Sequence, residues 1–297
     1  MSHGVHRSAQ NFVSLCEVGP RDGLQNEKRI IGVDEKVRYI ELLVAAGFRE
    51  IEVTSFVSPK WVPQLADAEQ VLARLPAKHG VLYSALVPNE QGLDRALAAG
   101  LKKIAVFTAA SEGFARKNIN ATIAESIERF RPVVVRAHEA SVSVRGYVSC
   151  IVACPIDGAI APEAVAKVCQ QLKDLGVDEF DLGDTIGVAH PDELARVIEA
   201  CACVVPMETL TVHLHDTFGR AMACAERALS MGVRRFDGST GGIGGCPYAL
   251  GATGNVASER LAALCASRGY CTSIDREGID AAARFITGVL TAPLSAS

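Results

Sequence analysis

The sequence predicts an α/β protein, a (β/α)8 TIM barrel with one additional C-terminal helix, on the basis of three observations. Short β-rich runs alternate with longer amphipathic runs along the chain, the β-rich runs number eight, and glycine ends several of the amphipathic runs. Strict alternation is typical of a parallel sheet covered by helices. Eight repeats favour closure of that sheet into a barrel over an open sheet.

The predicted elements follow one another at regular intervals. The strands span residues 12–18, 50–54, 82–87, 103–107, 143–150, 179–182, 209–214 and 234–237. Amphipathic spacing predicts helices between them, including residues 34–46, 89–99, 162–175, 192–203 and 219–231. Residues 255–267 and 276–290 supply the eighth helix and the additional one. The glycines that close a helix before the next strand are Gly47, Gly100, Gly176 and Gly232.

Composition favours one catalytic domain over residues 1–297. Of the 297 residues, 49% are hydrophobic, and no linker or low-complexity stretch interrupts the pattern. The net charge is −4, and Lys and Arg are scattered, which argues against nucleic acid or an anionic membrane surface as a partner. No apolar run reaches about 18 residues, so we expect no membrane span.

The ten cysteines are expected to be reduced thiols. Residues 1–10 lack the apolar core of a signal peptide, and no Cys-x-x-Cys pair indicates a zinc ribbon. Cys169, Cys201, Cys224 and Cys265 lie in apolar segments, where cysteine acts as a small buried hydrophobic residue. We therefore expect a cytoplasmic protein.

The strongest functional motif, His213-Leu214-His215, ends the seventh predicted strand. Alternate side chains of a strand share a face, so His213 and His215 can converge on one metal ion. A His-x-His pair taken alone is equally consistent with two hydrogen-bonded histidines at a barrel rim. The position supports function, because active sites of such barrels lie at the C-terminal ends of the strands.

A second motif, Arg21-Asp22, follows the first predicted strand. Strands 1 and 7 are near neighbours in a closed eight-stranded barrel, so Asp22 can add a carboxylate to the same ion. Arg21 offers a planar pair of donors to a substrate carboxylate or oxyanion. Taken alone, such a pair would more often be a helix cap or a salt bridge at the rim.

A glycine-rich loop follows the last predicted strand and leads to Asn255. Pro247 occupies the place of the third glycine of G-x-G-x-x-G, and no Gly-Lys-Ser/Thr is present, so we expect no nucleotide cofactor. A flexible loop that delivers Cys246 fits better, since this cysteine lies among loop residues rather than core residues. An inert loop cysteine is the alternative. Asn255 is either the N-cap of the following helix or a neutral oxygen ligand.

Three further polar residues are predicted at the same rim. Glu52 has apolar neighbours on both sides, so its carboxylate faces the barrel interior, where an unpaired charge is costly. Tyr147 lies on the fifth strand, and Asp184 follows the sixth. Because these polar residues all fall at the C-terminal ends of different predicted strands, one shared site explains them better than separate accidents.

The ligand set expected at this site is oxygen-rich. Asp22, Asn255 and two histidines, completed by water, favour Mg²⁺ or Mn²⁺ as the divalent metal. Zinc with Cys246 as a ligand is the main alternative.

The motifs resemble those of the 3-hydroxy-3-methylglutaryl-CoA lyase family over residues 13–282. The matching segments are residues 18–27, 52–64, 183–187, 213–217 and 244–249. The last segment, Gly-Gly-Cys-Pro-Tyr-Ala, is specific to the lyases, whereas Arg-Asp-Gly and His-x-His also occur in related synthases. The resemblance implies cleavage of 3-hydroxy-3-methylglutaryl-CoA to acetyl-CoA and acetoacetate, as in leucine degradation, and is consistent with a homodimer.

The resemblance also implies a role for each matching residue. The metal ligands would be Asp22, His213, His215 and Asn255. Arg21 would stabilise the developing enolate, and Cys246 would protonate the departing acetyl-CoA carbanion. Asp22 or His213 is the candidate base. The residues expected to contact substrate or to support the site are Gln25, Tyr147, Glu52 and Asp184.

Two departures from the family pattern, Gly241 and Ile156, are expected to alter the acyl pocket. They leave open a related substrate, such as citramalyl-CoA or 3-hydroxy-3-isohexenylglutaryl-CoA. A Claisen-condensing acyltransferase on the same barrel is a second alternative, although such synthases usually carry a longer C-terminal region. A metal-binding scaffold without activity is the third.

Overall fold

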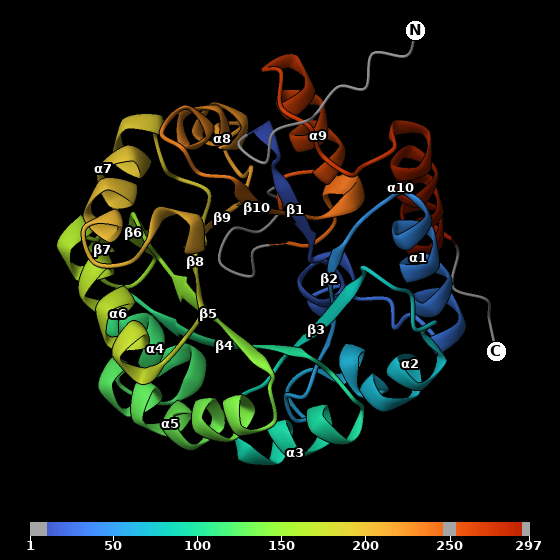
Figure 1. Cartoon of the computed structure of the whole chain (residues 1–297), viewed down its shortest axis with the longest axis horizontal. Coiled ribbons are helices and arrows are strands. Elements are labelled where there is room, and N and C mark those ends of the chain that lie inside the picture. The colour runs from blue at the N-terminus through green and yellow to red at the C-terminus, as the bar shows by residue number, and fades with distance from the viewer. Residues whose placement is uncertain (1–10, 246–253, 293–297) are drawn as a thin grey trace, which may run out of the picture.

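The computed structural model describes residues 11–245 and 254–292, and within them eight parallel strands close into a barrel surrounded by helices (Figure 1). Around the barrel the strands follow the order β1-β10-β9-β8-β5-β4-β3-β2, so each pairs with its neighbours in the chain. The strands are β1 (Ser14–Glu17), β2 (Glu50–Ser55), β3 (Leu82–Leu86), β4 (Lys103–Ala109), β5 (Ser143–Ser149), β8 (Glu179–Asp184), β9 (Leu210–Leu214) and β10 (Arg235–Gly238). The predicted TIM barrel is confirmed.

The helices form the outer layer (Figure 1). They are α1 (Val33–Ala45), α2 (Ala68–Arg74), α3 (Glu90–Ala98), α4 (Glu112–Ile119), α5 (Ile123–Glu139), α6 (Pro162–Leu175), α7 (Pro191–Ala202), α8 (Ala221–Ser230), α9 (Ser258–Ser267) and α10 (Arg276–Thr291). The additional C-terminal helix is α10, which packs against α1. Gly176 caps α6 with φ = 102°, as its position before a strand predicted. Within the described residues, no helix is long and apolar enough to cross a membrane.

Four local features differ from the expected pattern. A π-helix, η2 (Gly19–Gly23), follows β1, and a small antiparallel hairpin, β6 (Ala153–Cys154) with β7 (Gly158–Ala159), follows β5. Helix α4 is an extra helix between β4 and α5. Helix α9 begins at Ser258 with Ala257 as its N-cap, so the alternative of Asn255 as an N-cap is wrong. The remaining short elements are the 3-10 helices η3 (Pro63–Leu65), η4 (Met207–Thr209) and η5 (Thr240–Gly242).

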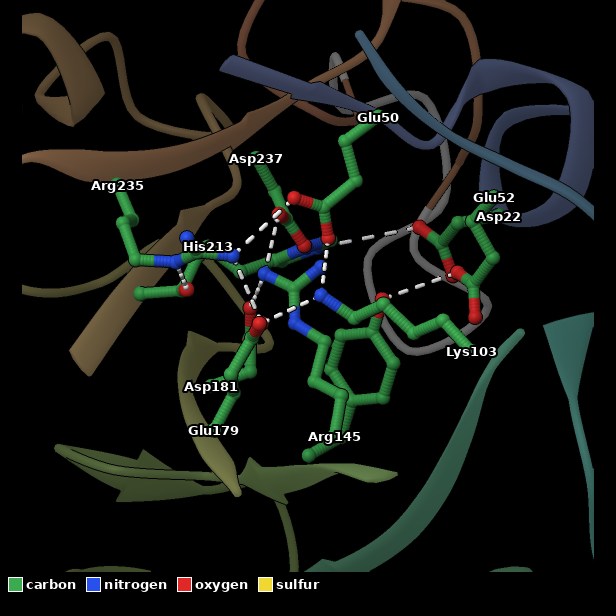
Figure 2. Close-up of polar contacts among 12 residues, drawn as sticks. Asp22, Glu50, Glu52, Lys103, Arg145, Glu179, Asp181, His213, Arg235 and Asp237 are labelled. Atoms are coloured by element: carbon green, nitrogen blue, oxygen red, sulfur yellow. Dashed lines mark hydrogen bonds and ion pairs between the residues drawn. The ribbon is translucent and has the colours of Figure 1, made fainter. Parts of the chain in front are cut away.

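The barrel interior is unusually polar at its N-terminal end. Barrels of this kind commonly fill such a layer with four branched apolar side chains from alternate strands. Here the four positions form a charge ring of Glu50, Lys103, Glu179 and Arg235, from β2, β4, β8 and β10 (Figure 2). Lys103 is paired with both glutamates, and Arg235 Nη2 lies 3.1 Å from Glu50 Oε2 and 2.8 Å from Glu179 Oε2. Each charge therefore has two opposite neighbours.

Glu17, at the end of β1, is a buried carboxylate that joins three parts of the chain. It accepts hydrogen bonds from Gly19 N (3.0 Å), Thr240 N (2.9 Å), Thr240 Oγ1 (2.6 Å) and Ser258 Oγ (2.7 Å). Burial raises its pKa to about 7, although these hydrogen bonds act in the opposite direction. The carboxylate thus connects β1 to η5 and to the start of α9.

We expect Glu17→Gln to stabilise the protein, relative to wild type, progressively more as the pH rises from 5 to 8. The folded-state pKa of Glu17 lies above its unfolded value of 4.5, so the wild type loses stability as pH rises through about 7. A shift of this size corresponds to roughly 3 kcal/mol. Glutamine has no proton to lose, and the neighbouring hydroxyls can turn to accept from its amide.

The measurement is the free energy of unfolding by denaturant titration at pH 5 and pH 8. Glu128→Gln is the control, because Glu128 is exposed and its pKa is lowered by Arg131. A difference between Glu17→Gln and wild type that is the same at both pH values would contradict the prediction.

Candidate metal centre and active site

His213 and His215 lie side by side inside the barrel mouth, as the strand alternation predicted. Their ring centroids are 5.3 Å apart, and both side chains are buried. His213 belongs to β9, and His215, just beyond it, forms a β-bridge with Asn255. The bridge brings the segment after β10 up to the two imidazoles.

The π-helix η2 carries Arg21 and Asp22 over the same mouth. The N–H groups of Arg21, Asp22 and Gly23 all donate to Val18 O, at 3.1, 2.7 and 3.2 Å, which winds the chain tightly after β1. Gly23 permits this winding, because a Cβ there would lie 2.8 Å from both Ile243 Cγ1 and Ser239 Oγ. The turn places Asp22 Oδ2 3.9 Å from His213 Nε2.

Asp22, His213 and His215 form a group that could hold a metal ion. One ligand atom from each lies within 4.8 Å of the other two, and the Asp22 and His213 atoms are 3.9 Å apart. Nδ1 of His215 is buried and has no hydrogen-bond partner among the described residues. A buried nitrogen without a partner is costly in a finished protein interior, so the donor set fits a cation.

The charge states of Asp22 and His215 also fit a cation, whereas His213 releases a proton when it binds one. Burial raises the pKa of Asp22, but the charges of Arg21 and His213 outweigh burial and lower it to about 2. Burial and the charge of His213 lower the pKa of His215 to about 4, so this imidazole is neutral at pH 7. Burial alone would lower the pKa of His213, but its hydrogen bond with Asp237 and the charge of Asp22 raise it to about 9.

Asn255 lies directly against the predicted ligands. Its Nδ2 donates to Asp22 Oδ2 at 2.8 Å and to Ile243 O at 3.4 Å. The two arms of an amide are assigned from the hydrogen-bond network, and without a cation the NH2 arm must face a carboxylate. The side chain therefore reaches the metal group, and its carbonyl oxygen is the atom available as a neutral ligand.

Arg21 is held rigidly beside this group. Its Nε donates to Glu52 Oε2 at 2.7 Å and its Nη1 to Asp22 Oδ1 at 2.6 Å. Tyr147 donates its hydroxyl to the same Glu52 oxygen at 2.9 Å, and the Arg21 guanidinium lies 5.3 Å from the Tyr147 ring centroid. Among the described residues no hydrogen bond occupies Nη2 of Arg21. One arm of the guanidinium is thus left for an external oxygen.

One of the candidate residues, Asp184, does not join the group. Asp184 accepts hydrogen bonds from Val188 N at 3.2 Å and Ala189 N at 2.9 Å, so its carboxylate fastens the loop after β8. Burial raises its pKa. Gln25 is half-buried, two positions beyond η2, and its contact with substrate stays a prediction. Cys246 lies outside the described residues.

Gly241 lies in η5, which packs against α10. A Cβ at Gly241 would point at Thr287 Cγ2 (3.2 Å) and Ala283 Cα (3.8 Å) of α10, on the outer side of the loop, and its φ of +80° favours glycine. The effect of Gly241 on an acyl pocket stays a prediction. Ile156 is 46% exposed at the turn between β6 and β7.

Three buried residues of the mouth were missed from sequence. Arg145, Asp181 and Asp237 lie just below the metal group, and Asp237 contacts His213. The signal was present, because Arg145 precedes Tyr147 by two positions on β5 and so faces the same interior. The same alternation applied to β8 and β10 would have found the two aspartates.

A barrel whose C-terminal mouth gathers a carboxylate, two imidazoles and an arginine defines an enzyme with a candidate divalent-metal centre. The HMGL-like family model matches residues 12–286, and the chain belongs to this family.

Named relatives agree with the family. Hydroxymethylglutaryl-CoA lyase of Pseudomonas mevalonii is 54% identical over 90% of this chain and 89% of its own length. The 3-hydroxy-3-isohexenylglutaryl-CoA/hydroxymethylglutaryl-CoA lyase of Pseudomonas aeruginosa is 50% identical over 94% of this chain and 93% of its own. The crystal structure of HMG-CoA lyase from Brucella melitensis matches with a TM-score of 0.93 at 46% identity, covering 95% of this chain and all of that one. The protein is a carbon–carbon lyase, the class that the sequence predicted.

Proposed function

We propose that this protein cleaves 3-hydroxy-3-methylglutaryl-CoA into acetyl-CoA and acetoacetate, using a divalent metal at the barrel mouth. The main observation behind the proposal is that Asp22, His213 and His215 lie close together, next to Arg21. The chain is also 54% identical to a protein named for this reaction.

The metal would be held by Asp22, His213, His215 and Asn255. This set of oxygen and imidazole ligands favours Mg²⁺ or Mn²⁺. When bound, the ion supplies Lewis-acid chemistry that polarises the hydroxyl and carboxylate oxygens of the substrate and lowers the pKa of the hydroxyl.

The protein side chains perform the rest of the cleavage. Asp22 or His213 takes the proton of the C3 hydroxyl, the C2–C3 bond breaks, and its electron pair moves into the thioester as an enolate. Arg21 stabilises the enolate oxygen with its free arm, because Glu52 and Asp22 hold the guanidinium in place before the charge develops. Protonation of the enolate carbon completes acetyl-CoA.

Cys246 is the proposed proton donor. The described residue two positions earlier, Gly244, lies at the mouth, where a Cβ would be 3.0 Å from Gly23 Cα and 2.9 Å from Asn255 Nδ2. The segment that leads to Cys246 therefore starts beside the metal ligands.

The test is a panel of CoA thioesters, each run with Mg²⁺, with Mn²⁺ and with a chelator. The panel includes the 3-methyl- and 3-isohexenyl-glutaryl compounds and citramalyl-CoA, because one relative carries both glutaryl names. We expect the methyl compound to release acetyl-CoA fastest and the chelator to abolish the release. Faster cleavage of another thioester would reassign the substrate. Condensation of acetyl-CoA with a 2-oxoacid, without any cleavage, would replace the proposal with a synthase.

The cytoplasmic location stays a prediction, since matched relatives carry both cytoplasmic and mitochondrial names. The homodimer also stays a prediction. Cell fractionation tests the first. Light scattering tests the second against the chain mass of 31.4 kDa.

A further inference from the structure

Directly beneath the metal group lies a buried layer of three ionisable side chains, Arg145, Asp181 and Asp237 (Figure 2). They come from β5, β8 and β10, and none is more than 2% exposed. Arg145 Nη2 donates to Asp181 Oδ2 at 2.7 Å and to Asp237 Oδ1 at 2.6 Å. One guanidinium therefore holds both carboxylates.

Asp237 connects this layer to the metal group through its second oxygen. Oδ2 of Asp237 lies 3.1 Å from Nδ1 of His213, while Oδ1 stays with Arg145. Rotation of the carboxylate away from His213 would also break its contact with Arg145 and leave the Asp237 charge unpaired in the interior, which is costly. A carboxylate paired with arginine can only accept hydrogen bonds, so Nδ1 of His213 is the donor.

We propose that Asp237 is a positioning residue that fixes the tautomer of His213, with the proton on Nδ1 and the lone pair on Nε2, the atom that faces Asp22. The inference rests on the proposed metal site and names the residue that prepares one of its ligands. A carboxylate that accepts from the second nitrogen of a ligating histidine sets the ring orientation and the basicity of the other nitrogen.

Asp237→Asn tests the inference by reversing the donor at this contact. Arg145 has no acceptor atom, so the new amide turns its oxygen to Arg145 and its NH2 group to His213. The NH2 group then donates to Nδ1 and moves the histidine proton to Nε2, where a metal would bind. Asp181→Asn is the matched control, because it removes the other carboxylate held by the same Arg145 atom but no hydrogen bond to His213.

The measurement is the Kd for Mn²⁺ by calorimetry on the purified full chain, at one pH and ionic strength. We expect Asp237→Asn to weaken Mn²⁺ binding about 10- to 100-fold and Asp181→Asn to weaken it about threefold or less. Equal weakening by the two variants, or unchanged affinity in Asp237→Asn, would overturn the role of Asp237. Absence of Mn²⁺ binding in the wild type would instead refute the metal site itself.

A second measurement covers the case in which Asp237→Asn fails to fold. Imidazole ¹⁵N spectra of the wild-type protein with Mg²⁺ report which nitrogen of His213 carries hydrogen, and a His213→Gln spectrum assigns the signal. We expect the hydrogen on Nδ1. A signal from hydrogen on Nε2 would overturn the inference.

Discussion

Arg21→Gln is expected to lower kcat for cleavage about 100- to 1000-fold, the loss typical of removing one preorganised donor from a developing oxyanion. The guanidinium is fixed by Glu52 and Asp22 before substrate arrives, so its stabilisation of the enolate requires no rearrangement. The same variant leaves Glu52 buried without its cation. Removing one partner of a buried ion pair destabilises a protein by about 3–5 kcal/mol.

The double variant Arg21→Gln/Glu52→Gln separates catalysis from stability. Neutralising both partners removes the unpaired charge, so the melting temperature should recover toward the wild-type value while kcat stays low. The measurement is kcat at saturating thioester and Mg²⁺, together with thermal unfolding of each variant. Recovery of kcat along with stability would show that Arg21 acts only through the fold.

Cys246→Ser is expected to lose about 100- to 10,000-fold in turnover, the range for removal of a positioned general acid. Serine keeps the size of the side chain but has a far higher pKa, so it donates a proton poorly. Affinity for Mn²⁺ should stay unchanged, because the proposed ligands do not include the thiol.

The control for this variant is Cys203→Ser, which changes an exposed cysteine at the end of α7 and should keep full activity. Both variants are assayed for acetyl-CoA release and for the Kd of Mn²⁺. Full turnover in Cys246→Ser would remove the proton donor from the mechanism. Loss of metal affinity in the same variant would favour the alternative in which the thiol is a ligand.

The fold could be predicted from sequence because each repeat carries its own periodicity. All eight barrel strands were placed to within a few residues, since alternation of β-rich and amphipathic runs is a local signal. The π-helix η2 could not be predicted in this way. It depends on three N–H groups sharing Val18 O and on the close approach of Gly23 to Ile243, which is a tertiary contact.

The same reasoning explains which parts of the site were predicted. His213 and His215 were predicted from the alternation of side chains between the two faces of a strand. Asp184 was assigned only from its position after a strand, without asking which face its side chain takes. On β8, Asp181 faces the interior, so Asp184, three positions later, faces the opposite side. The direction of a Cβ at Gly241, toward α10, could not be predicted, because it follows from a positive φ and sequence alone does not report φ.

The charge ring has a mechanical consequence for the closure of the barrel. Within the described chain, β10 pairs with β9 at a single registered position, and β1 pairs with β2 at two. Arg235 on β10 spans both of these short strand pairings: its side chain passes β9 to reach Glu179 on β8 and passes β1 to reach Glu50 on β2. The charge ring therefore helps to hold the barrel closed where the backbone pairing between strands is shortest. It does so at the N-terminal end of the barrel, so the C-terminal end is available for the catalytic residues.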